Sequence, residues 1–173
     1  RLEGEALVLD SDRCLGSDDG THATWDSAAP DSSQCLVSAD ATCRALTITG
    51  AAVTAATRVR GFTFTGGDAT SEGDPNYGYG GGVDVNGGAD PIVERCRMTG
   101  NLAGHTFDGF GGGLSVRGAG TSAEIRYCRI DNNTASSAWF AYGGGLYIGN
   151  SGYALVHDCV IAGNRASTAR VGD

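Results

Sequence analysis

The residues of this chain most suited to binding chemistry are four acids close to its N-terminus. They lie in the segment DSDRCLGSDDG, residues 10–20, and are Asp10, Asp12, Asp18 and Asp19. Hard cations such as Ca²⁺ bind several carboxylate oxygens, so the cluster is a candidate calcium site. It departs from the EF-hand pattern, because Cys14 and Leu15 stand where that loop has Asp or Asn and Gly. A solvated acidic loop is the preferred interpretation, and no other cofactor is expected.

Six cysteines could form disulfides, bind a metal or pack in a core. Three of them lie in the irregular N-terminal part, namely Cys14, Cys35 and Cys43. One disulfide among these three would staple a region with little core, and the sequence does not indicate which two would pair.

Aromatic residues gather in three segments that each lead into a run of glycines, SEGDPNYGY, GHTFDGF and SSAWFAY. These residues are Tyr77, Tyr79, Phe107, Phe110, Trp139, Phe140 and Tyr142. If the segments stack, the rings form a strip along one edge, which could bind sugar rings or a protein partner. A cap over an open corner of the core is the preferred interpretation of this strip.

The glycine runs belong to an internal repeat, which defines the elements that would position these residues. Three columns recur 31 or 32 residues apart: Gly80, Gly111 and Gly143, which begin the glycine runs; Cys96, Cys128 and Cys159; and Asn101, Asn133 and Asn164. A degenerate copy over residues 59–69 has Phe62 in place of Cys and Gly67 in place of Asn, and ALTITG, residues 45–50, resembles its first strand.

The repeat predicts an all-β fold, a parallel β-helix of about four to five coils. Apolar residues alternate with period two in short runs, which is typical of strands. Four inward ladders are expected: Val83, Leu114 and Leu146; Val85, Val116 and Ile148; Val93, Ile125 and Val156; and Met98, Ile130 and Ile161. The predicted coils cover residues 45–79, 80–110, 111–142 and 143–173, after a strand and an irregular segment in residues 1–44. Stacked coils about 4.8 Å apart would bury the ladders together.

The recurring residues have structural interpretations in such a coil. A phosphate-binding loop would need Gly-Lys-Ser/Thr after the glycines, and the chain has no Lys, so the glycines are expected to turn a tight corner. The cysteine column is expected to be a reduced, buried ladder, because a row of three thiols suits neither disulfides nor tetrahedral zinc. The asparagine column is expected to be a ladder of stacked amides at a turn.

Catalysis on a polysaccharide would need two carboxylates, or carboxylates with calcium and an arginine, on one face. The outward columns do not supply such a pair: Glu94 is followed by Arg126 and His157 at equivalent positions, and Asp131 is the one acid of its column. The sequence therefore favours a protein without enzymatic activity.

Composition and charge exclude several classes of function. All 12 basic residues are arginines, and with 20 acidic residues the net charge is −8, which opposes binding to nucleic acid or anionic lipid. No run of 18 apolar residues occurs, so no transmembrane helix is predicted. No signal peptide is recognised, and cysteines in a small chain rich in Ser, Thr, Gly and Asn indicate an exported protein.

The segments GFTFTGG, GYGGGVDV…DPIVERCRMTGNLA and GFGGGLSV…AEIRYCRIDNNTA resemble the repeats of polymorphic outer membrane proteins. That repeat pairs a Gly-Gly-apolar motif with an apolar-x-x-Asn motif, and the resemblance covers about residues 45–166. It implies a right-handed parallel β-helix in a bacterial surface or secreted protein, often an adhesin-like or passenger segment.

The expected function is therefore structural or adhesive, outside the cell or at a bacterial surface. The next glycine run would begin just after Asp173, so the chain is expected to be a fragment of a longer β-helix or a subunit that stacks end to end into a fibre. Expected partners are neighbouring repeats or other copies, a surface glycan, or a host or cell-surface protein. The alternative is a β-helix that binds or degrades carbohydrate at the aromatic edge.

Overall fold

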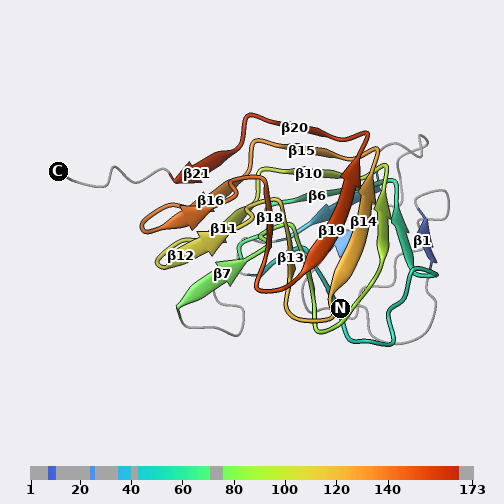
Figure 1. The fold of residues 1–173 in the computed structure, drawn as a ribbon. Coiled ribbons are helices and arrows are strands. Elements are labelled where there is room, and N and C mark those ends of the chain that lie inside the picture. The colour runs from blue at the N-terminus through green and yellow to red at the C-terminus, as the bar shows by residue number, and fades with distance from the viewer. Residues whose placement is uncertain (1–7, 11–23, 26–34, 40–42, 71–75, 168–173) are drawn as a thin grey trace.

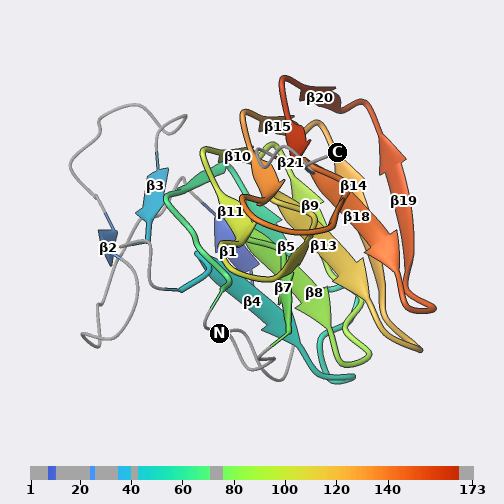
Figure 2. The same cartoon turned by 90° about the vertical axis from the view of Figure 1, so that its left-hand side faces the viewer.

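The structure of the protein, a computed structural model, describes residues 8–10, 24–25, 35–39, 43–70 and 76–167. The strands of these residues form five sheets (Figure 1). Three sheets form the walls of a solenoid, and two smaller sheets form a projection at one corner, which we call the tab (Figure 1 and Figure 2). The described residues contain no helix long and apolar enough to span a membrane.

Each wall sheet takes one strand from each successive coil. The first contains β4 (Leu46–Thr49), β8 (Val83–Asn86), β13 (Leu114–Arg117) and β18 (Leu146–Gly149). The second contains β1 (Val8–Asp10), β5 (Arg58–Arg60), β9 (Ile92–Glu94), β14 (Ser122–Arg126) and β19 (Tyr153–His157). The third contains β2 (Thr24–Trp25), β3 (Cys35–Ser38), β6 (Phe62–Thr65), β10 (Arg97–Thr99), β15 (Arg129–Asp131) and β20 (Val160–Ala162).

The tab is built from two three-stranded sheets. One contains β11 (Leu102–Gly104), β16 (Thr134–Ser136) and β21 (Arg165–Ser167). The other contains β7 (Tyr77–Tyr79), β12 (Asp108–Phe110) and β17 (Ala141–Tyr142). In the coils that contain β10 and β15, the chain leaves the third wall, runs out along one sheet of the tab and returns along the other to the next glycine run.

The predicted all-β, parallel β-helix is confirmed. From β4 to β18 the chain makes three turns, and the strands of successive coils pair in parallel. The N-terminal segment adds to the same walls, because β1 pairs in parallel with β5 and β3 pairs in parallel with β6. The strand β2 is the exception, since it pairs with β3 in the antiparallel direction.

The four predicted inward ladders have the expected registers. Leu114 pairs with Val83 and Leu146, and Ile130 pairs with Met98 and Ile161. In the inner coils these side chains are fully buried, and the polar residues between them point away from the core. One coil is too thin to enclose its own apolar residues, so the core depends on neighbouring coils.

The asparagine column links adjacent coils directly. Nδ2 of Asn101 donates to Oδ1 of Asn133 at 2.9 Å, and Nδ2 of Asn133 donates to Oδ1 of Asn164 at 3.0 Å. The same oxygens accept the backbone N–H groups of Asn101 and Asn133. Each amide also donates to a carbonyl of the preceding coil, at Phe64, Met98 and Ile130. The buried turn therefore has its polar groups paired from coil to coil.

Each of the three positions in a glycine run requires glycine for a different physical reason. The first has a left-handed backbone, with φ of 57° at Gly80 and 68° at Gly111. A Cβ on the second, as at Gly112, would clash with the carbonyl of Thr134 in the tab. A Cβ on the third, as at Gly113, would lie 2.8 Å from Asn133 Nδ2. The glycine run thus lets the chain pass between the tab and the asparagine ladder.

The cysteine column lies at the corner between the second and third walls. Cys96 and Cys128 are buried and Cys159 is half-buried, and all three are free thiols in the structure. Each Sγ lies 3.5 Å from a carbonyl oxygen of the preceding coil. Contact with the Cys96 thiol and burial raise the pKa of the Cys128 thiol, so it stays protonated at neutral pH.

The central rung of the asparagine ladder should be a major source of stability. In Asn133→Ala, the buried N–H of Asn101 and carbonyl of Met98 lose their partner, which should lower the free energy of unfolding by about 3 kcal/mol. Urea unfolding followed by circular dichroism measures this change. The matched control is Asn132→Gly, at an exposed left-handed position with φ of 55°, which should keep or slightly raise stability. Equal behaviour of the two variants would contradict the role of the ladder.

Candidate functional site

The tab carries aromatic rings at equivalent positions of successive coils. The strand register pairs Phe110 with Tyr79 on one side and with Tyr142 on the other. The ring centroids of Tyr79 and Phe110 are 4.8 Å apart, and those of Phe110 and Tyr142 are 5.0 Å apart with nearly parallel planes. We call these three residues the ring stack. It forms because parallel strands repeat equivalent side chains at the inter-strand spacing.

The ring stack covers part of the first wall. Tyr147, on the outer face of β18, packs edge-on against Phe110 with centroids 5.0 Å apart. Tyr79 is buried, and its ring also lies against the guanidinium of Arg117, 4.1 Å from Cζ to the centroid. The rings of Tyr79 and Phe110 therefore have their faces against other side chains rather than solvent.

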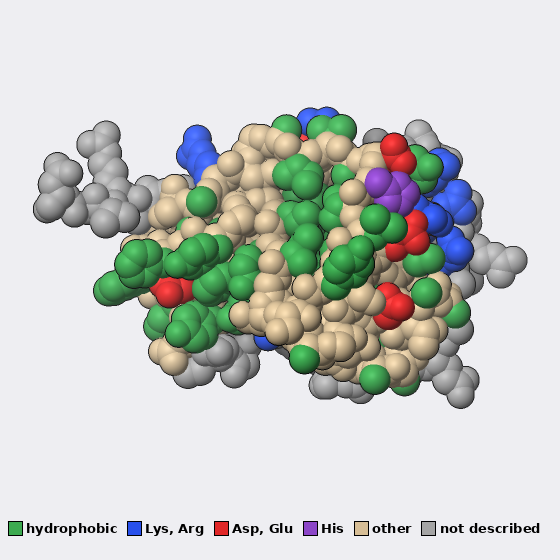
Figure 3. Space-filling view, viewed as in Figure 1, with side chains coloured by type: hydrophobic (Ala, Val, Ile, Leu, Met, Phe, Trp, Pro, Cys, Tyr) green, Lys and Arg blue, Asp and Glu red, His purple; other side chains and the backbone are tan. Residues whose placement is uncertain are grey.

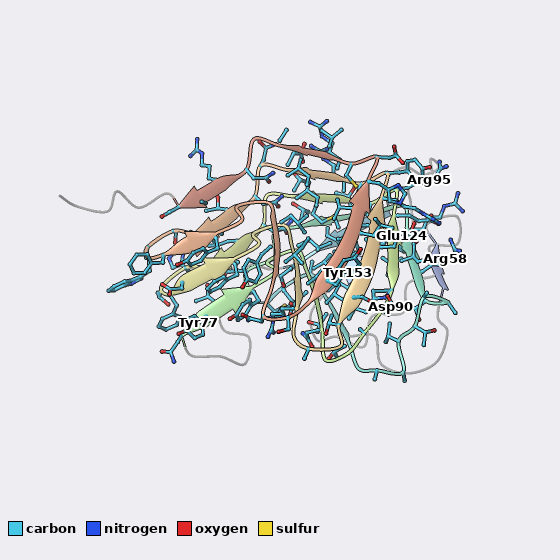
Figure 4. The ribbon with its side chains drawn as sticks, in the orientation of Figure 1. Arg58, Tyr77, Asp90, Arg95, Glu124 and Tyr153 are labelled. Carbon is cyan, nitrogen blue, oxygen red and sulfur yellow. The ribbon has the colours of Figure 1, made fainter. Side chains whose placement is uncertain are left out.

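The outer aromatic residues of the tab are exposed. The exposed fractions are 60% for Trp139, 63% for Phe140, 52% for Tyr142 and 41% for Tyr77, whereas Phe107 is half-buried. Figure 3 shows hydrophobic side chains gathered at the end of the molecule that carries the tab, with an acidic side chain among them. Tyr77 lies at the opposite end from Arg58, Arg95 and Glu124 (Figure 4).

The two sheets of the tab approach so closely that only small residues fit between them. A Cβ on Gly78 would clash with the carbonyl of Ala103, and a Cβ on Gly109 would clash with the carbonyl of Ala135. The exposed aromatic residues thus project from a thin, closely packed double layer.

Residues 137–140 connect β16 to β17 and form the part of the tab that we call the tip. The N–H groups of Ala138 and Trp139 donate to the Ser136 hydroxyl at 3.2 and 3.0 Å. The N–H of Phe140 donates to Asp108 Oδ1 at 3.2 Å, and the N–H of Ser137 donates to the Gly104 carbonyl at 2.9 Å. All four backbone donors of the tip are therefore satisfied within the protein, although its two aromatic side chains face solvent.

A buried ionic cluster beneath the ring stack was not predicted from the sequence. Asp84, on the outer face of β8, is fully buried. It accepts hydrogen bonds from Nε and Nη2 of Arg117 at 3.1 and 2.9 Å, from Asn86 Nδ2 at 2.7 Å, and from Arg44 and Ser115. A polar residue between two inward valines usually faces solvent, so the alternation of residues in β8 does not predict that Asp84 is buried. The nearby aromatic segment was the only sequence feature that could have indicated it.

The outward carboxylate of the third wall is held by two arginines. Asp131 accepts hydrogen bonds from Arg97 at 3.1 and 2.9 Å and also from Arg129. The hydrogen bond from Arg97 is the main reason that the pKa of Asp131 falls to about 2, with Arg129 adding to it. This carboxylate is therefore ionised at neutral pH and does not serve as a proton donor.

Two acids of the second wall meet at one guanidinium, which the sequence reading missed. Arg126 donates to Glu94 Oε2 at 2.8 Å and to Glu124 Oε1 at 2.8 Å. Glu124 also contacts His157 Nε2 at 3.1 Å. The hydrogen bond with His157, followed by that from Arg126, lowers the pKa of Glu124. A general acid for glycoside cleavage needs a raised pKa, which is the opposite direction.

A serine–histidine contact lies beside the tip. Ser137 Oγ is 3.2 Å from His105 Nδ1 and donates to the His105 carbonyl at 2.9 Å. A hydroxyl that donates to a carbonyl is poorly placed to transfer its proton to imidazole. The pair therefore links the loops of two successive coils.

Several predicted residues lie outside the part of the chain that the structure describes. These are Asp12, Asp18, Asp19 and Cys14. Asp10 and Cys35 are described only as members of β1 and β3, and Cys43 is buried. The calcium site and the N-terminal disulfide stay predictions. Within the described ranges, no three His, Cys, Asp or Glu residues are grouped so that they could hold a metal.

The stacked parallel coils define a β-solenoid, and comparison with protein families gives its class. The family model described as "right handed beta helix region" matches residues 31–172, so the chain belongs to the right-handed β-helix family. Comparisons with curated proteins and with solved structures give no match. The matched region begins within the N-terminal segment, consistent with the pairing of β3 with β6.

The contacts of His157 predict a pH-dependent stability of the last coil. Hydrogen bonds to Asp158 and then Glu124 raise the pKa of His157 above its ordinary value of 6.5. Its contribution to stability is therefore full below pH 6.5 and is lost as the pH rises through the raised pKa. Urea unfolding at about pH 5.5 and about pH 8.5 should show that the natural protein is less stable at the higher pH. This difference in the free energy of unfolding should be smaller in His157→Gln. An identical pH dependence in both proteins would contradict the assignment.

Proposed function

We propose that this protein is a non-enzymatic β-helix with a structural or adhesive role, outside the cell or at a bacterial surface, that docks through its tab. The observation that carries the proposal is the group of exposed aromatic residues on the tab. Contiguous exposed apolar surface on a soluble domain marks an interaction site. Trp and Tyr are also the residues most enriched in the energetic centres of interfaces.

The state of the carboxylates supports a role without catalysis. Asp84, Glu94 and Asp131 each contact at least two arginines, and Glu124 contacts an arginine and a histidine. The pKa values of Asp131 and Glu124 are lowered by these partners, so the two carboxylates stay ionised and do not donate protons near neutral pH.

The surface location is supported by composition and by the resemblance to polymorphic outer membrane protein repeats, whose members are bacterial surface or secreted proteins. Further repeats or other copies are proposed partners at the last coil. There Ile148 and Ile161 are exposed, although the equivalent Val116 and Ile130 are fully buried. A further coil would bury them again.

Carbohydrate binding is the second candidate function. It is favoured by Tyr142, which stacks on Phe110 through one face of its ring and is half exposed. A sugar ring packs on an aromatic ring through its C–H face, so an open tyrosine face is a suitable platform.

The proposal predicts that the purified chain turns over neither neutral nor acidic polysaccharides, with or without Ca²⁺. Release of reducing ends and formation of unsaturated products are the two readouts. Activity that is lost in Asp131→Asn, Glu94→Gln or Glu124→Gln would refute the non-enzymatic role. Activity that survives all three substitutions would indicate a contaminant, and circular dichroism of each variant checks its folding.

A further inference from the structure

The tip combines exposed apolar side chains with hydrogen-bonded backbone N–H groups. Its side chains Trp139 and Phe140 are large, apolar and more than half exposed. Its backbone donors, from Ser137 to Phe140, are all satisfied by Ser136, Asp108 and Gly104. Moving backbone donors out of water is unfavourable unless they are hydrogen-bonded, and here they already are. The N–H groups of the tip can thus leave water without losing hydrogen bonds.

The tip is also held in one conformation. The Phe140 carbonyl accepts the N–H of Gly109 at 2.9 Å, and the Ser137 hydroxyl donates to the His105 carbonyl of the preceding coil. Little conformational entropy is left to lose when such a loop docks.

The tip is better suited to an apolar environment than to a sugar. Glycan recognition combines a ring face with hydrogen-bonding groups beside it. Three polar groups lie beside Trp139 and Phe140, and each already contacts another group of the protein. They are the Ser136 hydroxyl, the Ser137 hydroxyl and Asp108 Oδ1.

The negative charge of the chain limits which apolar environment the tip can enter. The chain has a net charge of −8 and Asp108 lies within the tab, so an anionic lipid surface would repel it. A zwitterionic lipid surface carries no net charge. Trp and Tyr favour its interface, because an apolar ring and a polar tip match the change from hydrocarbon to water. Tyr142 lies in β17, directly after the tip, and Tyr77 begins β7 in the same sheet of the tab.

We propose that the tip of the tab inserts Trp139 and Phe140 into the interface of a lipid surface with zwitterionic headgroups. This inference rests on the proposed docking role of the tab and names its partner. Tyr77 and Tyr142 contact the headgroup region, and the thin double layer of the tab holds the tip away from the walls. The binding is peripheral, since two side chains bury too little apolar surface for permanent anchoring.

Flotation of the full chain with phosphatidylcholine vesicles tests the proposal. The natural protein should float, and the double substitution Trp139→Ala with Phe140→Ala should weaken partitioning by at least about tenfold. The matched control is Tyr153→Ala, because Tyr153 is 65% exposed and lies on the outer face of β19 in the second wall. This control should float as the natural protein does. Adding phosphatidylglycerol should weaken binding, because the protein and that lipid are both negatively charged.

The outcomes separate the lipid proposal from the docking role on which it rests. Absence of flotation, equal flotation of the double variant, or stronger binding to anionic vesicles would each overturn the lipid proposal. If the chain then bound a neutral glycan or formed dimers through Trp139 and Phe140, the docking role would stand without a lipid partner. If polysaccharide turnover appeared instead, the proposed function itself would fail. Circular dichroism of the double variant establishes that it is folded.

Discussion

The hydrogen bond from one asparagine amide to the next is the interaction on which the rest of the molecule depends. It joins residues 32 or 31 positions apart in sequence and fixes the separation and register of successive coils at one corner. The third glycine of each run packs directly on the amide, and the second passes beneath the tab. Once this corner is fixed, the apolar ladders of the three walls coincide and bury one another.

The same stacking that builds the core also builds the surface of the tab. The aromatic residues of the ring stack pair because their strands are in register, and the rings of Tyr79 and Phe110 are covered by neighbouring side chains. Arg117 connects the stack to the buried Asp84, since it donates to this carboxylate and lies over the Tyr79 ring. The exposed aromatic residues of the tab are those of the tip, Tyr77, and Tyr142 at the outer end of the stack.

The sequence predicts the periodic features of this protein well, because each repeat presents the same residue types at the same positions. Val83, Leu114 and Leu146 could be aligned from their distance to the glycine run alone. Features that occur in one coil only, and are not repeated in the others, were not predictable. Burial of Asp84 requires Arg117 from the next coil and a cover by Tyr79, and neither follows from the alternation of apolar residues. The meeting of Glu94 and Glu124 at Arg126 likewise depends on side-chain reach between strands.

The split of the aromatic strip into covered and exposed rings has the same origin. Equivalent positions Tyr79, Phe110 and Tyr142 stack. Trp139 and Phe140 lie in a loop whose counterpart in the preceding coil has the same length but a different sequence, with Phe107 and Asp108 at these positions. The repeat therefore predicts the stack, and only the structure shows that the backbone N–H groups of the tip are hydrogen-bonded within the protein.

The central claim is that the tip is an exposed loop whose backbone N–H groups are all hydrogen-bonded, held by stacked coils. Amide hydrogen exchange resolved at single residues tests it most directly. The account predicts that the N–H groups of Ala138, Trp139 and Phe140 exchange far more slowly than an unstructured loop, despite the exposure of the side chains. Exchange of these three amides at the rate of an unstructured peptide, in a protein whose wall strands remain protected, would contradict it.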